Sequence, residues 1–186
     1  MLLRGGRGFV SRTAFFSFIA AVVAGDRASK WAVMEAMGPA DTISLVPGLA
    51  SLVHVRNPGA AFGILAGADP LLRSVFFTIV TVAVVAVLTG VFMRGRLPGK
   101  AEAAAAAAIV GGALGNAWDR VMLGEVVDFI DLYVGAWHWP AFNVADVCIN
   151  VGVGLFIYHL FFIEPKRAKQ EAAASGGASA PAKKSG

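Results

Sequence analysis

Four long stretches of apolar residues alternate with shorter polar segments along the chain. The first begins near Phe9 and continues as a more polar helix through Met37, and the others begin near Leu71, Ala101 and Ala141. Because a hydrocarbon core about 30 Å thick needs roughly 20 helical residues, each stretch is long enough to cross it. The pattern predicts a mainly α membrane protein with four transmembrane helices, over about 14–37, 71–93, 101–123 and 141–163.

The first apolar stretch has an alternative explanation as a cleaved signal peptide. An Arg-rich start precedes it and small residues lie near its end, as in such peptides. We reject this interpretation because three further spans follow and the stretch continues into an organised polar motif.

The segment between the first two helices, about Gly38–Pro70, is more than a linker. It holds two β-prone runs, Thr42–Val46 and Ala50–Val55, separated by the turn pair Pro47-Gly48. We expect a small β hairpin or sheet there, on the outer membrane surface. The other outer segment, about Gly124–Pro140, is interpreted as a loop.

Composition supports a membrane protein. Hydrophobic residues make up 57% of the 186 residues and charged residues only 15%, against about 25% charged in soluble domains. The net charge of +4 could suggest nucleic-acid binding, but most Lys and Arg residues cluster beside apolar segments. These clusters lie before the first helix, in the linker near 94–100, and in the C-terminal tail.

The basic clusters predict the orientation. An even number of spans brings all three to one side, which the positive-inside rule makes cytoplasmic. We therefore divide the chain into a basic cytoplasmic N-terminus (1–13), a four-helix membrane domain (14–163) and a tail (164–186). The tail is rich in Ala, Ser, Gly and Lys and is expected to be disordered.

Polar residues inside the spans gather near their outer ends. Asp26 and Lys30 are spaced i,i+4 and can pair, either as a snorkelling interfacial ion pair or as a clamp on an active site. Asn116, Asp119 and Arg120 end the third span. We expect Arg120 to neutralise Asp119 and the group to order the following loop.

The outer segments carry further candidates. Asn57-Pro58-Gly59 is a turn signal, and a plain tight turn would explain it. Asp128 lies between apolar neighbours, so desolvation should raise its pKa. Asp131 could serve instead, although an ordinary loop carboxylate is the simpler interpretation.

The fourth span opens with Asn143, Asp146 and Asn150 on one helix face. An Asp without a cationic neighbour one turn inside a membrane helix is usually functional. If Asp128 and Asp146 lie close together, one can hold a proton while the other acts as a base toward water, as in aspartic proteases. We find no convincing metal site in the sequence, and the lone Cys148 forms no internal disulfide.

Five stretches together resemble the bacterial lipoprotein signal peptidases, the type II signal peptidases, which are membrane aspartic proteases. In order, they are Asp26-Arg27-Ala28-Ser29-Lys30, Asn57-Pro58-Gly59-Ala60-Ala61-Phe62, Gly115-Asn116-Ala117-Trp118-Asp119-Arg120, Val126-Val127-Asp128-Phe129-Ile130-Asp131 and Phe142-Asn143-Val144-Ala145-Asp146. The resemblance covers about residues 14–163.

The resemblance implies that the substrate is a prolipoprotein whose cysteine carries diacylglycerol, cut on the N-terminal side of that cysteine in the bacterial inner membrane. It implies that the catalytic pair is Asp128 and Asp146. The residues implied to bind substrate or support the site are Asn57, Asn116, Arg120 and Asn143. Those implied to have a structural role are Asp26, Lys30 and Asp119. The resemblance also implies inhibition by the cyclic peptide globomycin. We expect no metal or other cofactor, no nucleic-acid partner, and a monomer.

Two other classes were weighed against a protease. A transporter would place polar residues along the full fourth span, which instead turns apolar after Asn150 apart from His159. A non-enzymatic scaffold would explain the small residues of Gly111–Gly115, but it gives no reason for two aspartates near the outer loops.

Overall fold

The computed structural model describes residues 10–59, 67, 69–97, 99–166 and 170. The four predicted helices are present: α1 (Arg12–Ala36), α2 (Pro70–Met93), α3 (Lys100–Leu123) and α4 (Val144–Tyr158), which continues into the π-helical turn η2 (His159–Ile163). α4 starts later than expected because Asn143 caps its N-terminus. The remaining N-terminal residues 1–9 and nearly all of the expected disordered tail lie outside the described residues.

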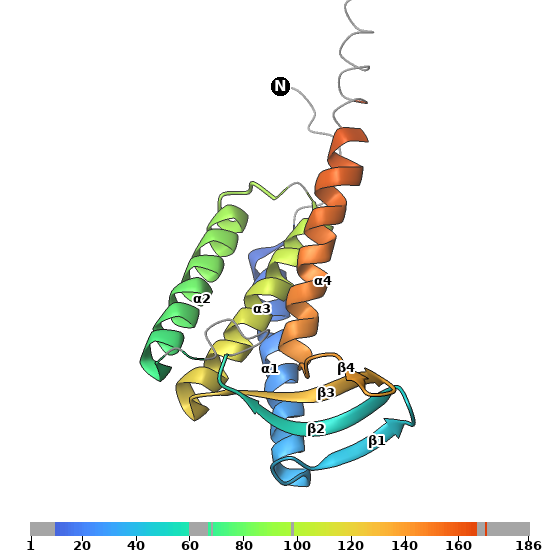
Figure 1. The fold of residues 1–186 in the computed structure, drawn as a ribbon. Coiled ribbons are helices and arrows are strands. Elements are labelled where there is room, and N and C mark those ends of the chain that lie inside the picture. The colour runs from blue at the N-terminus through green and yellow to red at the C-terminus, as the bar shows by residue number, and fades with distance from the viewer. Residues whose placement is uncertain (1–9, 60–66, 68, 98, 167–169, 171–186) are drawn as a thin grey trace, which may run out of the picture.

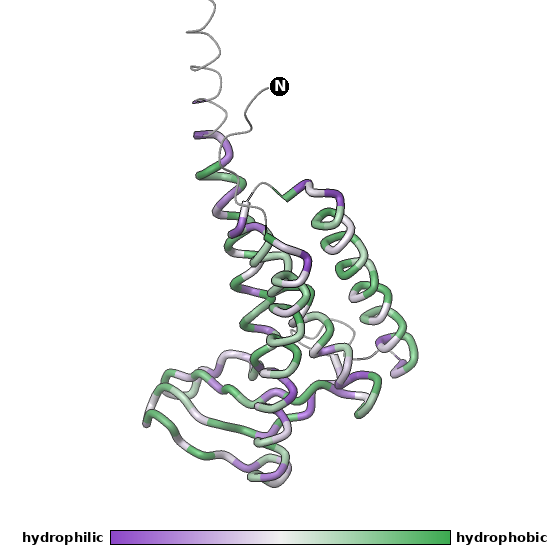
Figure 2. Tube along the Cα trace, turned by 180° about the vertical axis from the view of Figure 1, so that it is seen from behind, coloured by the Kyte–Doolittle hydropathy of each residue, from purple (hydrophilic) through white to green (hydrophobic). Residues whose placement is uncertain are grey.

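Two of the helices, Pro70–Met93 and Val144–Lys166, are long and apolar enough to cross a membrane by length and composition. α1 and α3 carry more charged residues, so the four-span arrangement stays a prediction. Figure 2 shows the helices as mainly hydrophobic, with hydrophilic positions concentrated near the sheet and at the helix ends.

A four-stranded antiparallel sheet lies across one end of the helices (Figure 1). Its strands are β1 (Thr42–Val46), β2 (Ala50–Asn57), β3 (Val126–Val134) and β4 (Trp137–His138), in that order. The hairpin predicted between the first two helices is therefore confirmed. The interpretation of 124–140 as a loop is wrong, because β-branched and aromatic residues at 126–134 pair with β2 as a central strand.

Three described segments lie at the other end of the helical bundle. The start of α1, the α2–α3 connection and the far end of α4 all lie away from the sheet (Figure 1). That the basic segments share one side of a membrane stays a prediction, because most of the N-terminal segment and of the tail lies outside the described residues. Which side of a membrane they face stays a prediction.

α3 is the central helix and packs against α1, α2 and α4. Small residues allow these close approaches: a Cβ on Gly112 would lie 2.4 Å from the carbonyl oxygen of Ala145, and one on Gly152 would lie 2.7 Å from that of Ala105. The alanine-rich stretch of α3 is mostly buried for the same reason. α2 is peripheral and has no buried residue.

The end of α1 anchors the sheet. Val33 and Met37 form a buried cluster with Phe129 of β3, with Leu52 of β2 packed against it. This contact holds β3 over the ends of α1, α3 and α4, where most of the polar motif residues lie.

Candidate active site

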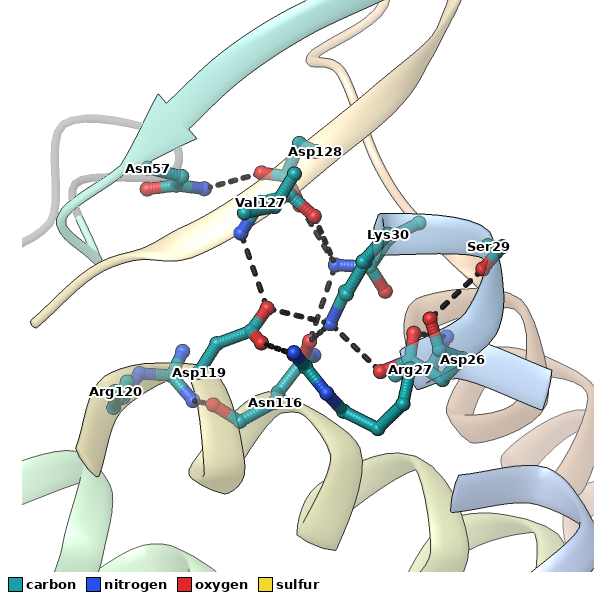
Figure 3. A network of polar contacts seen from close by, with 12 residues as sticks. Asp26, Arg27, Ser29, Lys30, Asn57, Asn116, Asp119, Arg120, Val127 and Asp128 are labelled. Atoms are coloured by element: carbon teal, nitrogen blue, oxygen red, sulfur yellow. Dashed lines mark hydrogen bonds and ion pairs between the residues drawn. The ribbon is translucent and has the colours of Figure 1, made fainter. Parts of the chain in front are cut away.

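A buried ion-pair cluster joins α1 to α3 beneath β3. Lys30 Nζ lies 2.8 Å from Asp26 Oδ2 and 2.9 Å from Asp119 Oδ2, and all three side chains are fully buried. Arg27 pairs with the other oxygen of Asp119 (Figure 3). The cluster is a clamp inside the protein rather than a snorkelling pair at its surface.

No direct ion pair joins Arg120 to Asp119 in the described part of the chain; Asp119 pairs with Lys30 and Arg27 instead, and its charge acts on Arg120 only at longer range. Consecutive residues of a helix point in different directions, and Asp119 faces α1 while Arg120 faces α2. The Arg120 guanidinium lies 4.3 Å above the ring of Phe77 in α2 and donates to the carbonyl oxygen of Asn116 at 3.4 Å. Sequence reasoning assigned no role to Arg27, although Arg27 lies in the same motif as Asp26 and Lys30.

The clamp also positions the neighbouring elements. Asp26 Oδ1 accepts a hydrogen bond from the backbone N–H of Ala145 at 2.9 Å, which ties the start of α4 to α1. Asp119 Oδ2 accepts one from the backbone N–H of Val127 at 3.2 Å, which fixes β3. Strand β3 and helix α4 carry Asp128 and Asp146, so both candidate carboxylates rest on this clamp.

Asn116 connects the clamp to Asp146. Its Oδ1 accepts from Lys30 Nζ at 3.0 Å, and its Nδ2 donates to Asp146 Oδ1 at 2.8 Å. The lysine can only donate, which fixes the orientation of the amide with its N–H groups toward Asp146.

Asn143 contacts both candidate carboxylates. Its side-chain Nδ2 donates to Asp128 Oδ1 at 2.8 Å, and its backbone N–H donates to Asp146 Oδ2 at 3.1 Å. Its Oδ1 accepts from the backbone N–H of Asp146 at 3.0 Å, which completes a capping box at the start of α4. Asn143 is fully buried.

Asp128 is almost fully buried, with 2% of its surface exposed. Its second oxygen, Oδ2, accepts from Asn57 Nδ2 at 2.9 Å. Burial raises the pKa of Asp128 to about 6, and the nearby charge of Asp146 acts in the same direction, against the hydrogen bonds from Asn57 and Asn143. The raised pKa expected from the apolar neighbours is therefore confirmed.

Asn57 is both part of a turn and part of the site. Its Oδ1 accepts from the backbone N–H of Gly59 at 2.9 Å, and Gly59 has a φ of +94° that favours glycine. The turn directs the amide nitrogen of Asn57 toward Asp128, as Figure 3 shows. The rest of this motif, residues 60–62, lies outside the described residues.

Asp131 is not part of this arrangement. It lies three residues after Asp128, and strand alternation sends the two side chains to opposite faces. Its carboxylate lies 2.9 Å from Nδ1 of His138. His159, at the far end of α4, has its Nδ1 2.9 Å from Glu102 Oε1. Asn150 donates to the backbone oxygen of Asp146 at 2.9 Å and is exposed.

The geometry brings together two carboxylates from different elements, each accepting two hydrogen bonds. The pKa of Asp128 is raised to about 6, and two neighbouring carboxyl groups of this kind can share a single proton. Such a pair can both withdraw a proton from water and supply one to a substrate oxygen.

The chain is similar to proteins of known family. The family described as signal peptidase (SPase) II matches residues 18–162. A lipoprotein signal peptidase of Desulforapulum autotrophicum is 40% identical over 141 residues, covering 76% of this chain and 87% of that protein. One from Geobacter sulfurreducens is 43% identical over 143 residues, covering 77% and 88%. A bacterial membrane enzyme solved by the in meso method at 2.3 Å shares a TM-score of 0.73 and 32% identity, over 83% of this chain and 92% of that one.

Proposed function

Since the chain belongs to the signal peptidase II family and is a lipoprotein-processing protease, we propose that it cuts diacylglyceryl-modified prolipoproteins with water activated by Asp128 and Asp146. The bond cut is the one on the N-terminal side of the lipidated cysteine. The observation that carries the proposal is the bridge through Asn143, which donates to both carboxylates.

The two aspartates have different roles in the proposed mechanism. Burial raises the pKa of Asp128 to about 6, and in the proposed mechanism the protonated form of Asp128 donates its proton to the scissile carbonyl oxygen. Asp146 takes a proton from water, and the resulting hydroxide attacks the carbonyl carbon. Collapse of the tetrahedral intermediate breaks the C–N bond, the proton on Asp146 goes to the departing amine, and one hydroxyl proton of the intermediate returns to Asp128.

The surrounding amides hold this pair in position. Asn57 and Asn143 donate to Asp128, and Asn116 donates to Asp146. Arg120 lies within electrostatic reach of both aspartates and is available to bind a substrate carbonyl. Asp26, Lys30 and Asp119 act structurally, through the clamp that carries β3 and α4.

The site lies at the level of the outer membrane interface in this proposal. All four helices of the peptidase domain (14–163) span the inner membrane, with both termini cytoplasmic and the sheet outside. The charges of α1 that would otherwise face lipid are largely neutralised within the clamp. A diacylglyceryl anchor keeps its acyl chains in the outer leaflet, so the scissile bond of the substrate lies at the same depth as the site.

We propose further that the enzyme works as a monomer, without a cofactor, and binds globomycin-type inhibitors.

Substrate selectivity tests the proposal. The purified enzyme is given a prolipoprotein with or without the diacylglyceryl group, and the products are analysed by mass spectrometry. We expect cleavage of the modified substrate alone, with a product that begins at the lipidated cysteine. Equal cleavage of the unmodified precursor, or a cut at another bond, would contradict it.

A further inference from the structure

A second polar site lies beside the catalytic pair, at the start of α2. A cavity of about 170 Å³ opens between this helix and the end of α3, and Arg73, Ser74, Arg120 and Glu125 contribute its polar lining. Pro58, which follows Asn57 in the chain, forms another part of the wall. Arg73 is the one charged residue of α2.

The described lining of the cavity has two cations and one acid, and Asp146, Asp128 and Asp119 also act on Arg120 from outside the lining. Arg73 and Arg120 both line it, and the buried Nε of Arg73 has no hydrogen-bond partner. Glu125 is the only acid among the described lining residues, and no ion pair in the described part of the chain joins it to either arginine. A buried donor without a partner is costly, so an anion in the cavity would be stabilised.

The chemistry favours a phosphate group. Planar guanidinium groups bind phosphate oxygens in a two-pronged geometry, and two of them suit a group with several oxygens. The hydroxyl of Ser74 supplies another donor. A neutral ester carbonyl, such as those of a diacylglyceryl group, would bring no negative charge to the Arg73 guanidinium.

The surroundings indicate that the phosphate belongs to a lipid. Apolar side chains next to Arg73 and Ser74 on α2 are strongly exposed, at 72% for Leu71, 57% for Leu72 and 46% for Phe76. They offer a surface for acyl chains directly beside the cavity. We propose that this cavity binds the phosphodiester of an anionic glycerophospholipid, with Arg73 and Arg120 holding the headgroup.

The lipid site shares Arg120 with the proposed substrate-binding group, and Arg73 is the residue that distinguishes the two. Arg120 lies within reach of the charges on Asp128 and Asp146, whereas no hydrogen bond or ion pair in the described part of the chain joins Arg73 to either aspartate. The position of the cavity in the membrane follows from the proposed function, in which α2 spans the bilayer. Binding of a phosphate group by the two arginines does not depend on the catalytic roles proposed for the aspartates.

Native mass spectrometry of the full chain in detergent tests the proposal. The protein is mixed with equal amounts of dioleoylphosphatidylglycerol and dioleoylphosphatidylcholine, and bound lipid is counted. We expect a preference of about tenfold for the anionic lipid, lost in Arg73→Gln. Arg94→Gln, at the opposite end of the same helix, should keep it. Asp128→Asn should also keep it, so a failure of catalysis and a failure of lipid binding are distinguishable.

A second Arg73 variant and a competition with inorganic phosphate complete the experiment. If Arg73→Gln does not fold, Arg73→Lys keeps the charge without the planar fork and should reduce the preference. Inorganic phosphate at the lipid's concentration should not displace the lipid. Equal binding of both lipids by the unchanged protein, an unchanged preference in the folded Arg73 variant, or displacement by inorganic phosphate would each overturn the proposal.

Discussion

Lys30 donates from Nζ to Oδ1 of Asn116 at 3.0 Å, in a site where both side chains are buried. The ammonium fixes which end of the amide is oxygen, so Nδ2 points at Asp146, 2.8 Å away. A charge in the structural clamp thereby sets the hydrogen bonding of a proposed catalytic carboxylate. Changes in the clamp should affect both stability and catalysis.

Replacing Lys30 by Met should destabilise the protein strongly. The substitution leaves Asp26 without its cation and removes one of the two cations on Asp119. Breaking a buried pair from one side typically costs about 3–5 kcal/mol. The free energy of unfolding in mixed detergent measures this. Lys100→Met at an exposed position should change it by less than about 0.5 kcal/mol, and equal effects of the two would contradict the clamp.

Replacing Asn143 by Ala should lower kcat by about 100-fold. It removes the hydrogen bond from the side-chain amide to Asp128. It also removes the hydrogen bond that the side-chain oxygen accepts from the backbone of Asp146 in the capping box. The lost cap should also cost about 1 kcal/mol of stability. Asn150→Ala, on the same helix face, removes only a bond to a backbone oxygen and should keep kcat within about threefold. Cleavage kinetics separate the two, and similar rates in both variants would argue against Asn143 as a bridge.

Gly115 is expected to tolerate no side chain. A Cβ there would lie 2.6 Å from Asp26 Oδ2, inside the clamp. Gly115→Ala should therefore destabilise the protein by about 1–3 kcal/mol through overpacking. A Cβ at Gly154 meets nothing within 4 Å, so Gly154→Ala should stabilise α4 by up to about 1 kcal/mol. Thermal unfolding of both proteins gives the answer, and a neutral Gly115→Ala would show that α1 and α3 are not packed this closely.

Stability should depend on pH through Asp128. Its pKa rises from 3.8 to about 6 on folding, so the folded state binds more protons between these values than the unfolded state. Stability therefore falls as pH rises through this window, by about 1 kcal/mol between pH 5 and pH 7. Asp128→Asn should remove that part of the pH dependence, as measured by unfolding at both values. An identical pH slope in the two proteins would show that Asp128 titrates normally.

Elements that are determined by residues close together in the chain could be predicted from the sequence. Apolar length located the four helices, and the turn pair Pro47-Gly48 located the hairpin. The strand at 126–134 was missed because its alternation is interrupted by Asp128 and Asp131, and its pairing with β2 joins distant parts of the chain.

The sequence predicts which side chains share a face of one helix better than it predicts which side chains meet across two helices. Spacing placed Asn116, Asp119 and Arg120 near one another on α3 but could not show which neighbouring helix each one meets. Asp119 meets Arg27 and Lys30 of α1, and Arg120 meets Phe77 of α2. Helix rotation and crossing decide these contacts, and small residues such as Gly112 on α3 set how closely helices pack.

The most direct measurement of the proposed catalytic pair is the rate of lipoprotein cleavage by three single variants. Asp128→Asn and Asp146→Asn each remove a proton-transferring carboxylate with little change in size, and each should lower kcat by at least about 100-fold. Asp131→Asn, on the same strand but paired with His138, serves as the matched control and should stay within about threefold of the unchanged enzyme. Near-normal cleavage by either the Asp128 or the Asp146 variant would contradict the aspartate pair.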